Sequence, residues 1–323
     1  MPTSLIYMLP AFIVVLSIVV FIHEMGHYLA GRMCGVGVKA FSIGFGREVF
    51  GWNDKHGTRW KWCLIPLGGY VKFAGDMNSA SQPDQNVDPG LSDAARSAMF
   101  QFKPLWQRAF VVVAGPLANF ILAIAIFAGI FYFNGRYIVP PIVTEIIEGG
   151  AAEEAGIEAG DIIVAIDGTS VTSFNQLQRY ISVRSDIPVS IDVDRDGQSL
   201  SFTATPKVHD TKDQFDNPIR FGLLGVRSAP KPEDVQQITF GPGGALMEGV
   251  RETGYNMART FTFLGEIITG KQDATQLGGP VRIARMSGQV ATLGVVALIS
   301  FVALLSVSIG LLNLYPIPVL DGG

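Results

Sequence analysis

The stretch AFIVVLSIVVFIHEMGHYLA, residues 11–30, decides how the rest of the chain folds. Residues 5–22 carry no charged side chain, and the apolar run continues after His23 and Glu24 toward Ala30. A helix needs about 20 apolar residues to cross the hydrocarbon core of a bilayer, and a backbone in lipid must satisfy its own hydrogen bonds. The sequence therefore predicts a membrane-spanning helix with polar residues inside its span.

His23, Glu24 and His27 form an H-E-x-x-H motif on this predicted helix. Positions i and i+4 share one helix face, so both imidazoles can hold one metal ion. Glu24 projects beside them and can take a proton from a water on the metal. A glutamate in a membrane span costs about 3 kcal/mol unless it faces a polar cavity. This setting favours a metal site over a solvated histidine pair.

Two further uncharged stretches are long enough to span a bilayer, residues 109–133 and residues 286–320, the latter most apolar after Leu293. The N-terminal apolar stretch, residues 5–22, could instead be a signal peptide. However, no Lys or Arg precedes Arg32 and no A-x-A cleavage site follows, which argues against that alternative.

The composition agrees with a membrane protein that carries a moderate soluble part. Hydrophobic residues make up 48% of the chain and charged residues 16%, and the mean hydropathy is +0.34. Soluble domains average about 25% charged residues, so a disordered chain and an ordinary cytosolic enzyme both fit this composition poorly. A net charge of −4 provides no basic field for nucleic acid, and two cysteines cannot form a disulfide framework.

Basic residues indicate how the helices are oriented, because cytoplasmic loops carry an excess of Lys and Arg. Residues 32–108 contain ten basic residues in 77 positions, whereas residues 136–285 contain fourteen in 150. We therefore expect the first loop in the cytoplasm, and the N-terminus and the long second loop outside. Cys34 and Cys63 then lie in the reducing compartment as free thiols.

A catalytic zinc ion needs three protein ligands and an open position for water. His56 and His209 lie in predicted soluble loops and fit poorly as the third ligand. Asp321 is the only acidic residue at the end of the third apolar segment, and it follows two prolines that break a helix. Irregular backbone at membrane depth is tolerated where it lines a cavity. A carboxylate there needs a cation, so Asp321 is the candidate third ligand. An interfacial aspartate after a helix is the alternative.

Short strands are predicted in the first loop, at residues 37–43, 47–52, 58–65 and 70–73, with a turn at 53–57. In the second loop the patterns predict a short helix at 151–156, strands at 161–166 and 189–194, and a helix at 174–182. Residues 243–268 form a helix-like stretch with an apolar stripe.

Residues 156–168, GIEAGDIIVAIDG, resemble the signature of a bacterial PDZ domain. Residues 222–226 resemble the carboxylate-binding loop of that family, placed late as in circularly permuted members. The resemblance implies that a peptide C-terminus binds at Gly222, Leu223, Leu224 and Gly225 by strand addition. Any other small β-rich domain is the alternative.

Three separated motifs together resemble the site-two protease family of intramembrane zinc metalloproteases. They are FIHEMGH at residues 21–27, AGPLAN at 114–119 and NLYPIPVLDG at 313–322, in the family order and over nearly the whole chain. The bacterial branch typified by the regulator of sigma-E protease is the most similar. The resemblance implies that His23, His27 and Asp321 bind Zn²⁺, that Glu24 is the catalytic acid and base, and that Asn313 lies near the substrate.

The resemblance also implies a substrate and a location. The strands of residues 37–73 resemble the membrane-reentrant β-loop of the family, which receives the substrate as an added strand, here at Gly68, Gly69 and Tyr70. The implied substrate is a single-pass membrane protein already trimmed on its outer side, such as an anti-sigma factor or a remnant signal peptide, cut in regulated intramembrane proteolysis. The implied location is the bacterial inner membrane, with the active site near the cytoplasm and the PDZ domain in the periplasm.

We therefore expect a polytopic α-helical membrane protein with a membrane-associated β-hairpin region and an inserted PDZ-like (α+β) domain. It has one PDZ-like segment where familiar members have two, and it stops at Gly323 where relatives continue into a fourth membrane helix. The expected segments are the first membrane helix (1–33), the cytoplasmic loop with reentrant strands (34–104), the second membrane helix (105–135), the PDZ-like domain (136–228), an amphipathic periplasmic region (229–292) and the third membrane helix (293–323).

A non-enzymatic membrane scaffold is the competing hypothesis, with a PDZ domain that captures peptide ends and a structural metal site. Structural zinc prefers four protein ligands, usually with cysteine, and Cys34 lies seven residues after His27. The ligand types alone do not select zinc over iron or cobalt.

Overall fold

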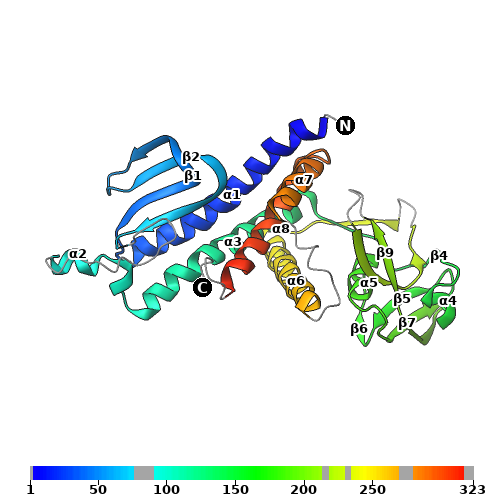
Figure 1. Ribbon diagram of the computed structural model, residues 1–323. Helices are drawn as coiled ribbons and strands as arrows, with labels where there is room; N and C mark the ends of the chain where they lie inside the picture. The colour runs from blue at the N-terminus through cyan, green and yellow to red at the C-terminus, as the bar shows by residue number, and fades with distance from the viewer. Residues whose placement is uncertain (1–2, 76–90, 213–217, 230–233, 269–278, 316–323) are drawn as a thin grey trace. The chain divides into compact units, whose positions relative to one another are not determined.

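The computed structural model describes residues 3–75, 91–212, 218–229, 234–268 and 279–315 (Figure 1). The chain forms two compact units. The first combines Met1–Tyr132 with Gly241–Gly323, and the second is Phe133–Phe240. The second unit is thus an insertion between two parts of the first.

Three helices of the first unit are long and apolar enough to cross a membrane, as the sequence predicts. They are α1 (Thr3–Met33), α3 (Leu105–Asn134) and α8 (Val295–Leu314). The unit also contains α2 (Asp93–Ser97), the 3-10 turn η1 (Phe100–Phe102), α6 (Pro242–Ile268) and α7 (Pro280–Ala291).

The third uncharged stretch, residues 286–320, is not one helix from its start. Its first residues belong to α7, and the membrane helix α8 begins at Val295. Gly294 separates α7 from α8 with a φ of 108°, a backbone conformation that favours glycine. The expected start of the third membrane helix at residue 293 is therefore two residues early.

Helix α8 packs against both α1 and α3. Val302 and Leu305 of α8 form one buried cluster with Val15 and Val19 of α1. A Cβ atom added at Gly310 of α8 would lie only 3.2 Å from the backbone carbonyl oxygen of Pro116 on α3. In lipid the hydrophobic effect does not drive helices together, so close packing at glycine and other small residues contributes to their association.

Strands β1 (Val38–Asn53) and β2 (Arg59–Phe73) form a hairpin that lies along α1 (Figure 1). Both strands bend, so residues 40–43 pair with residues 69–72 on one side and with residues 59–62 on the other. Residues 50–53 pair with residues 59–62 from the far side. The strands predicted from the sequence are present, but they are halves of two bent strands.

The hairpin is fixed to α1 through aromatic contacts and one carboxylate. The buried Phe41 ring of β1 contacts the Phe21 and Tyr28 rings of α1, with ring centroids 5.7 and 5.9 Å apart. Asp54, in the turn, accepts hydrogen bonds from the hydroxyl of Tyr28 on α1 (3.3 Å) and from Nε1 of Trp60 (3.0 Å).

The bent outer part of the hairpin exposes large apolar side chains to its surroundings, which suits contact with lipid. These side chains are Phe45, Val49, Phe50, Trp52, Trp62, Leu64, Ile65 and Leu67.

The second unit contains a four-stranded sheet with the strand order β6-β5-β7-β8. These strands are β5 (Ile162–Ile166), β6 (Thr169–Ser170), β7 (Val189–Arg195) and β8 (Gln198–Ala204). Helices α4 (Ala151–Ala155) and α5 (Phe174–Ser182) match the predicted helices. Shorter pairs join β3 (Arg136–Ile138) to β12 (Gln236–Ile238), β4 (Glu145–Ile146) to β11 (Val226–Arg227), and β9 (Lys207–Lys212) to β10 (Pro218–Leu223).

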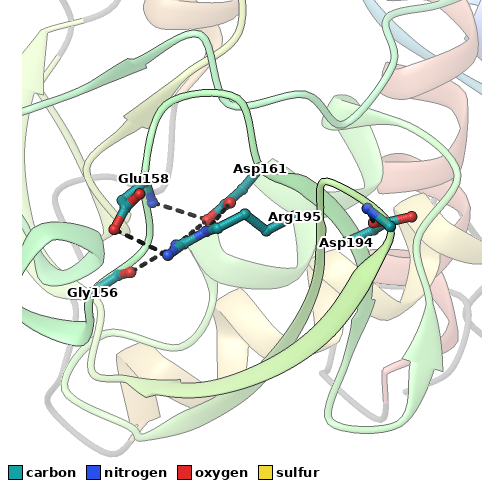
Figure 2. Close-up of polar contacts among 6 residues, drawn as sticks. Gly156, Glu158, Asp161, Asp194 and Arg195 are labelled. Atoms are coloured by element: carbon teal, nitrogen blue, oxygen red, sulfur yellow. Dashed lines mark hydrogen bonds and ion pairs between the residues drawn. The ribbon is translucent and has the colours of Figure 1, made fainter.

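Asp161 and Arg195 form an ion pair that ties the loop before β5 to the end of β7 (Figure 2). The Asp161 side chain is 1% exposed and accepts hydrogen bonds from Nε (2.7 Å) and Nη2 (2.8 Å) of Arg195. Arg195 also donates to the Gly156 carbonyl oxygen (2.9 Å), and the backbone N–H of Glu158 donates to Asp161 (2.9 Å). The hydrogen bonds from Arg195, against the opposing effect of burial, hold the pKa of Asp161 below its ordinary value.

We predict that Asp161→Asn lowers the free energy of unfolding of the second unit by about 1–3 kcal/mol at pH 7, because Arg195 loses its charged partner. A carboxyl group whose pKa is depressed by folding stabilises the fold above its unfolded pKa of about 4. This contribution is lost as the pH falls through the lower folded pKa, so wild type and variant should converge below about pH 4. Hydrogen exchange of the second-unit amides measures the difference.

The matched control is Glu154→Gln, which removes an exposed ion pair with Lys207 in the same unit. Exposed pairs contribute little, so this variant should exchange like the wild type. Equal effects of the two substitutions would contradict the structural role of Asp161.

Candidate metal centre

His23 and His27 lie one turn apart on α1 and turn their imidazoles toward each other. Their Nε2 atoms are 3.2 Å apart, and the two residues are 5% and 8% exposed. Zinc bonds imidazole nitrogen at about 2.0–2.1 Å, so two ligands of a tetrahedral ion lie about 3.3 Å apart. The two histidines therefore have the spacing that one zinc ion requires.

The orientation of His27 is fixed by α3. Its Nδ1 atom lies 2.8 Å from the backbone carbonyl oxygen of Val111, inside the protein. A carbonyl oxygen only accepts, so Nδ1 must carry the hydrogen and donate it, and Nε2 must carry the lone pair. This is the tautomer that binds a metal through Nε2, with a second contact that holds the ring in place.

Gly115 makes room for the His27 ring. A Cβ atom added at this position would lie 2.2 Å from Nε2 of His27. Val111, Gly115 and Asn119 are spaced by four residues and therefore share one face of α3. Sequence reasoning placed Gly115 and Asn119 in a family motif without giving them a role, although the glycine and the four-residue spacing were visible.

His23 contacts two asparagine side chains, one from each of the other spanning helices. Nδ2 of Asn119 on α3 lies 3.2 Å from Nδ1, and Nδ2 of Asn313 on α8 lies 3.2 Å from Nε2. Asn313, which follows His23 by 290 positions, is therefore part of the site.

Glu24 lies beside the hairpin. A Cβ atom added at Gly69 would lie 3.1 Å from Cγ of Glu24 and 2.7 Å from Cγ1 of Val20, so β2 meets α1 at this glycine. Of the other predicted substrate residues, Gly68 packs against the Phe45 ring, and the Tyr70 hydroxyl accepts a hydrogen bond of 2.8 Å from Lys61. The structure thus brings residue 69 to the motif.

Asp321, the candidate third ligand, lies outside the described residues. Among the described residues, no three His, Cys, Asp or Glu side chains gather closely enough to hold a metal ion. Cys34, the alternative ligand considered above, therefore does not join His23 and His27, and the third ligand must come from elsewhere in the chain or from solvent.

The predicted peptide-binding residues form one continuous segment of the second unit. Gly222 and Leu223 end β10, and the Gly225 carbonyl oxygen accepts a hydrogen bond of 2.8 Å from the Ile147 N–H. The carbonyl of buried Leu224 accepts one of 2.7 Å from the N–H of Ala152. The segment is therefore held against the start of α4.

The chain is similar to known proteins over nearly its whole length. The model of peptidase family M50 matches residues 11–323. A protein of Agrobacterium fabrum, provisionally named a zinc metalloprotease, is 50% identical over 317 residues, which cover 98% of this chain and 84% of that protein. A protein of Mesorhizobium japonicum with the same provisional name is 48% identical over 313 residues, covering 97% and 85%. Metalloprotease MmpA of Caulobacter vibrioides is 41% identical over 340 residues, covering 98% and 84%.

We predict that Gly115→Ala weakens zinc binding about 10–100-fold, because the added methyl group displaces the His27 ring from its contact with Val111. Competition with a fluorescent zinc chelator measures the affinity. Gly129→Ala is the matched control, since a Cβ atom at that position of α3 meets nothing within 4 Å. If Gly115→Ala and Gly129→Ala bind zinc equally well, the role given to Gly115 is wrong.

Proposed function

Because the chain belongs to peptidase family M50 and is a membrane zinc metalloprotease, we propose that it cuts peptide bonds within the membrane-spanning segments of single-pass membrane proteins. One observation carries this proposal: a histidine pair with zinc spacing lies inside a helix long enough to cross a bilayer. The relatives, named as metalloproteases, argue against the competing scaffold hypothesis.

We assign His23, His27 and Asp321 as the zinc ligands. Two imidazoles and one carboxylate are a donor set that zinc accepts, and three protein ligands leave a position for water or substrate. Zinc bound there supplies Lewis acidity, which makes water a stronger acid and polarises the peptide carbonyl. The buried surroundings of the histidines restrict bulk water at the site.

Glu24 acts as the general base and acid. Its carboxylate takes a proton from the attacking water and returns it to the nitrogen of the leaving peptide segment. The Asn313 amide donates a hydrogen bond to the negative charge that develops on the carbonyl oxygen. The 3.2 Å contact of this amide with Nε2 of His23, a proposed zinc ligand, supports that role.

The substrate must reach the site in an extended form, because a helix keeps its carbonyl groups in internal hydrogen bonds. Residues 69–71 of β2 pair with residues 41–43 of β1 on one side. Among the described residues, no strand pairs with residues 69–71 on their other side. We propose that an unwound substrate segment adds there as a strand, which brings its backbone next to Glu24.

The proposed location is the inner membrane of a bacterium. The density of basic residues in the first loop supports a cytoplasmic hairpin and a periplasmic second unit. We propose that the substrate is first trimmed on its outer side, as for an anti-sigma factor or a remnant signal peptide, in regulated intramembrane proteolysis. Residues 222–225 of the PDZ-like unit then bind the new C-terminus through backbone N–H groups.

We predict that Glu24→Gln lowers the cleavage of a transmembrane reporter about 10²–10⁴-fold, because the amide cannot accept the proton of water. The variant should still bind zinc, since Glu24 is not assigned as a ligand. Cleavage in reconstituted vesicles and zinc analysis of the same preparation measure both properties. Equal cleavage by wild type and variant would contradict the mechanism.

We predict that Asp321→Asn weakens zinc binding and abolishes cleavage without unfolding the second unit. A neutral amide oxygen is a poorer zinc ligand than a carboxylate, and two histidines alone leave the ion under-ligated. Chelator competition measures the affinity, and hydrogen exchange follows the second unit. Full zinc occupancy in this variant would refute the assignment of Asp321.

We predict that removing the second unit changes which substrates are cut but leaves zinc bound. Ile138 and Gln236 pair directly across β3 and β12, so a short Gly-Ser turn can replace residues 139–235 without moving the strand ends. If the unit selects trimmed substrates, the shortened protein should also cut reporters with intact outer domains. Loss of zinc in the shortened protein would show that the unit is structural and would refute its role in substrate selection.

A further inference from the structure

Asn119 is a buried polar side chain to which the proposed mechanism gives no role. It lies on α3 with 0% exposure, and its Nδ2 atom is 3.2 Å from Nδ1 of His23. The Ser306 hydroxyl on α8 donates a hydrogen bond of 2.9 Å to the Asn119 backbone carbonyl. A Cβ atom added at Gly310 would lie 3.3 Å from Cβ of Asn119. Helices α3 and α8 therefore enclose the residue and leave little access for water to its contact with His23.

Asn119 and Asn313 cannot both direct their amide nitrogen at a neutral His23 ring. Nδ2 of Asn119 faces Nδ1, and Nδ2 of Asn313 faces Nε2. An amide nitrogen only donates, whereas a neutral imidazole has one donor nitrogen and one acceptor nitrogen. One of the two amides must therefore present its oxygen. The nitrogen and oxygen of an amide have nearly the same shape, and their hydrogen bonds decide which is which.

Metal binding decides which amide presents oxygen. The Nε2 atom of His23 faces Nε2 of His27 and must carry a lone pair to act as a ligand. The hydrogen of His23 then sits on Nδ1, and a donor there requires an acceptor from Asn119. Oδ1 of Asn119, buried on the other side of the amide, has no hydrogen-bond partner in the described structure. Exchanging the two amide atoms gives this oxygen the Nδ1–H of His23 as its donor.

We infer that Asn119 is a positioning residue: its amide oxygen accepts the Nδ1 hydrogen of His23 and holds the Nε2 lone pair toward the metal position. The carbonyl of Val111 does the same for His27, so one face of α3 orients both ligands. A neutral acceptor suits this place, since a further buried carboxylate in the membrane would be costly. The inference rests on the proposed zinc site.

Zinc affinity of the full chain in detergent micelles tests the inference, measured by competition with a fluorescent chelator. Asn119→Leu removes the acceptor and should weaken zinc binding about 10–100-fold, the usual effect of losing the second contact of a metal-binding histidine. Asn119→Asp keeps an oxygen acceptor but has no N–H to donate. It should bind zinc at least as tightly as the wild type, because a carboxylate increases the basicity of the ligand.

Nitrogen-15 NMR of the zinc-free protein gives a second readout that does not depend on zinc or activity. The chain has four histidines, so comparison with a His23→Gln variant identifies the His23 signals. The hydrogen of His23 should reside on Nδ1 in the wild type and in Asn119→Asp, because an oxygen at position 119 then accepts it and Nδ2 of Asn313 donates to Nε2. In Asn119→Leu it should move to Nε2, where His27 can accept it.

Ser306→Ala is the matched control, because it removes a contact to the same residue but leaves the amide in place. It should bind zinc like the wild type, and loss of binding equal to that of Asn119→Leu would show that packing explains the effect. Unchanged affinity in Asn119→Leu, or weak binding in Asn119→Asp, would also overturn the inference. A wild type that binds no zinc would overturn the proposed function as well, so the two failures are distinguishable.

Discussion

The hydrogen bond from His27 to the Val111 carbonyl is the interaction on which the rest of the membrane unit depends. It forms only because α1 and α3 touch through their backbones: a Cβ atom added at Gly26 would lie 2.3 Å from the Ala114 carbonyl oxygen. In lipid, two apolar helices gain little from contact alone, so small residues and buried polar contacts must hold them together. The same residues that bring the helices together also shape the site.

The polar groups near the site come from four different elements of the membrane unit. Helix α1 carries the histidines and Glu24, α3 orients their rings, α8 brings Asn313, and β2 reaches Glu24 at Gly69. Polar side chains inside a membrane need hydrogen-bond partners from the protein, because the hydrocarbon core contains no water to bond with them. Loss of any one element would therefore leave buried polar groups without partners as well as an incomplete site.

The sequence predicts the parts of the structure that depend on local pattern. Long apolar runs predict the spanning helices, and H-E-x-x-H predicts the histidine pair, because each signal lies within a few turns of one helix. The bent part of β1 contains Gly44 and Gly46, and α8 begins after Gly294; all three glycines have positive φ angles, which the pattern does not show. The role of Asn119 depends on a contact 96 positions away, which periodicity alone cannot reveal. Asp321 remains a prediction from the sequence.

The bend of the hairpin also decides which strand segments are sheet edges. Residues 59–62 and residues 41–43 each pair with a segment on both sides, whereas residues 50–53 and residues 69–71 each pair on one side only among the described residues. An edge segment has backbone N–H and C=O groups that a further strand can pair with, and an inner segment does not. A strand added at residues 50–53 would be separated from residue 69 by three strand segments. Of the two edges, only the one at residues 69–71 lies beside Glu24.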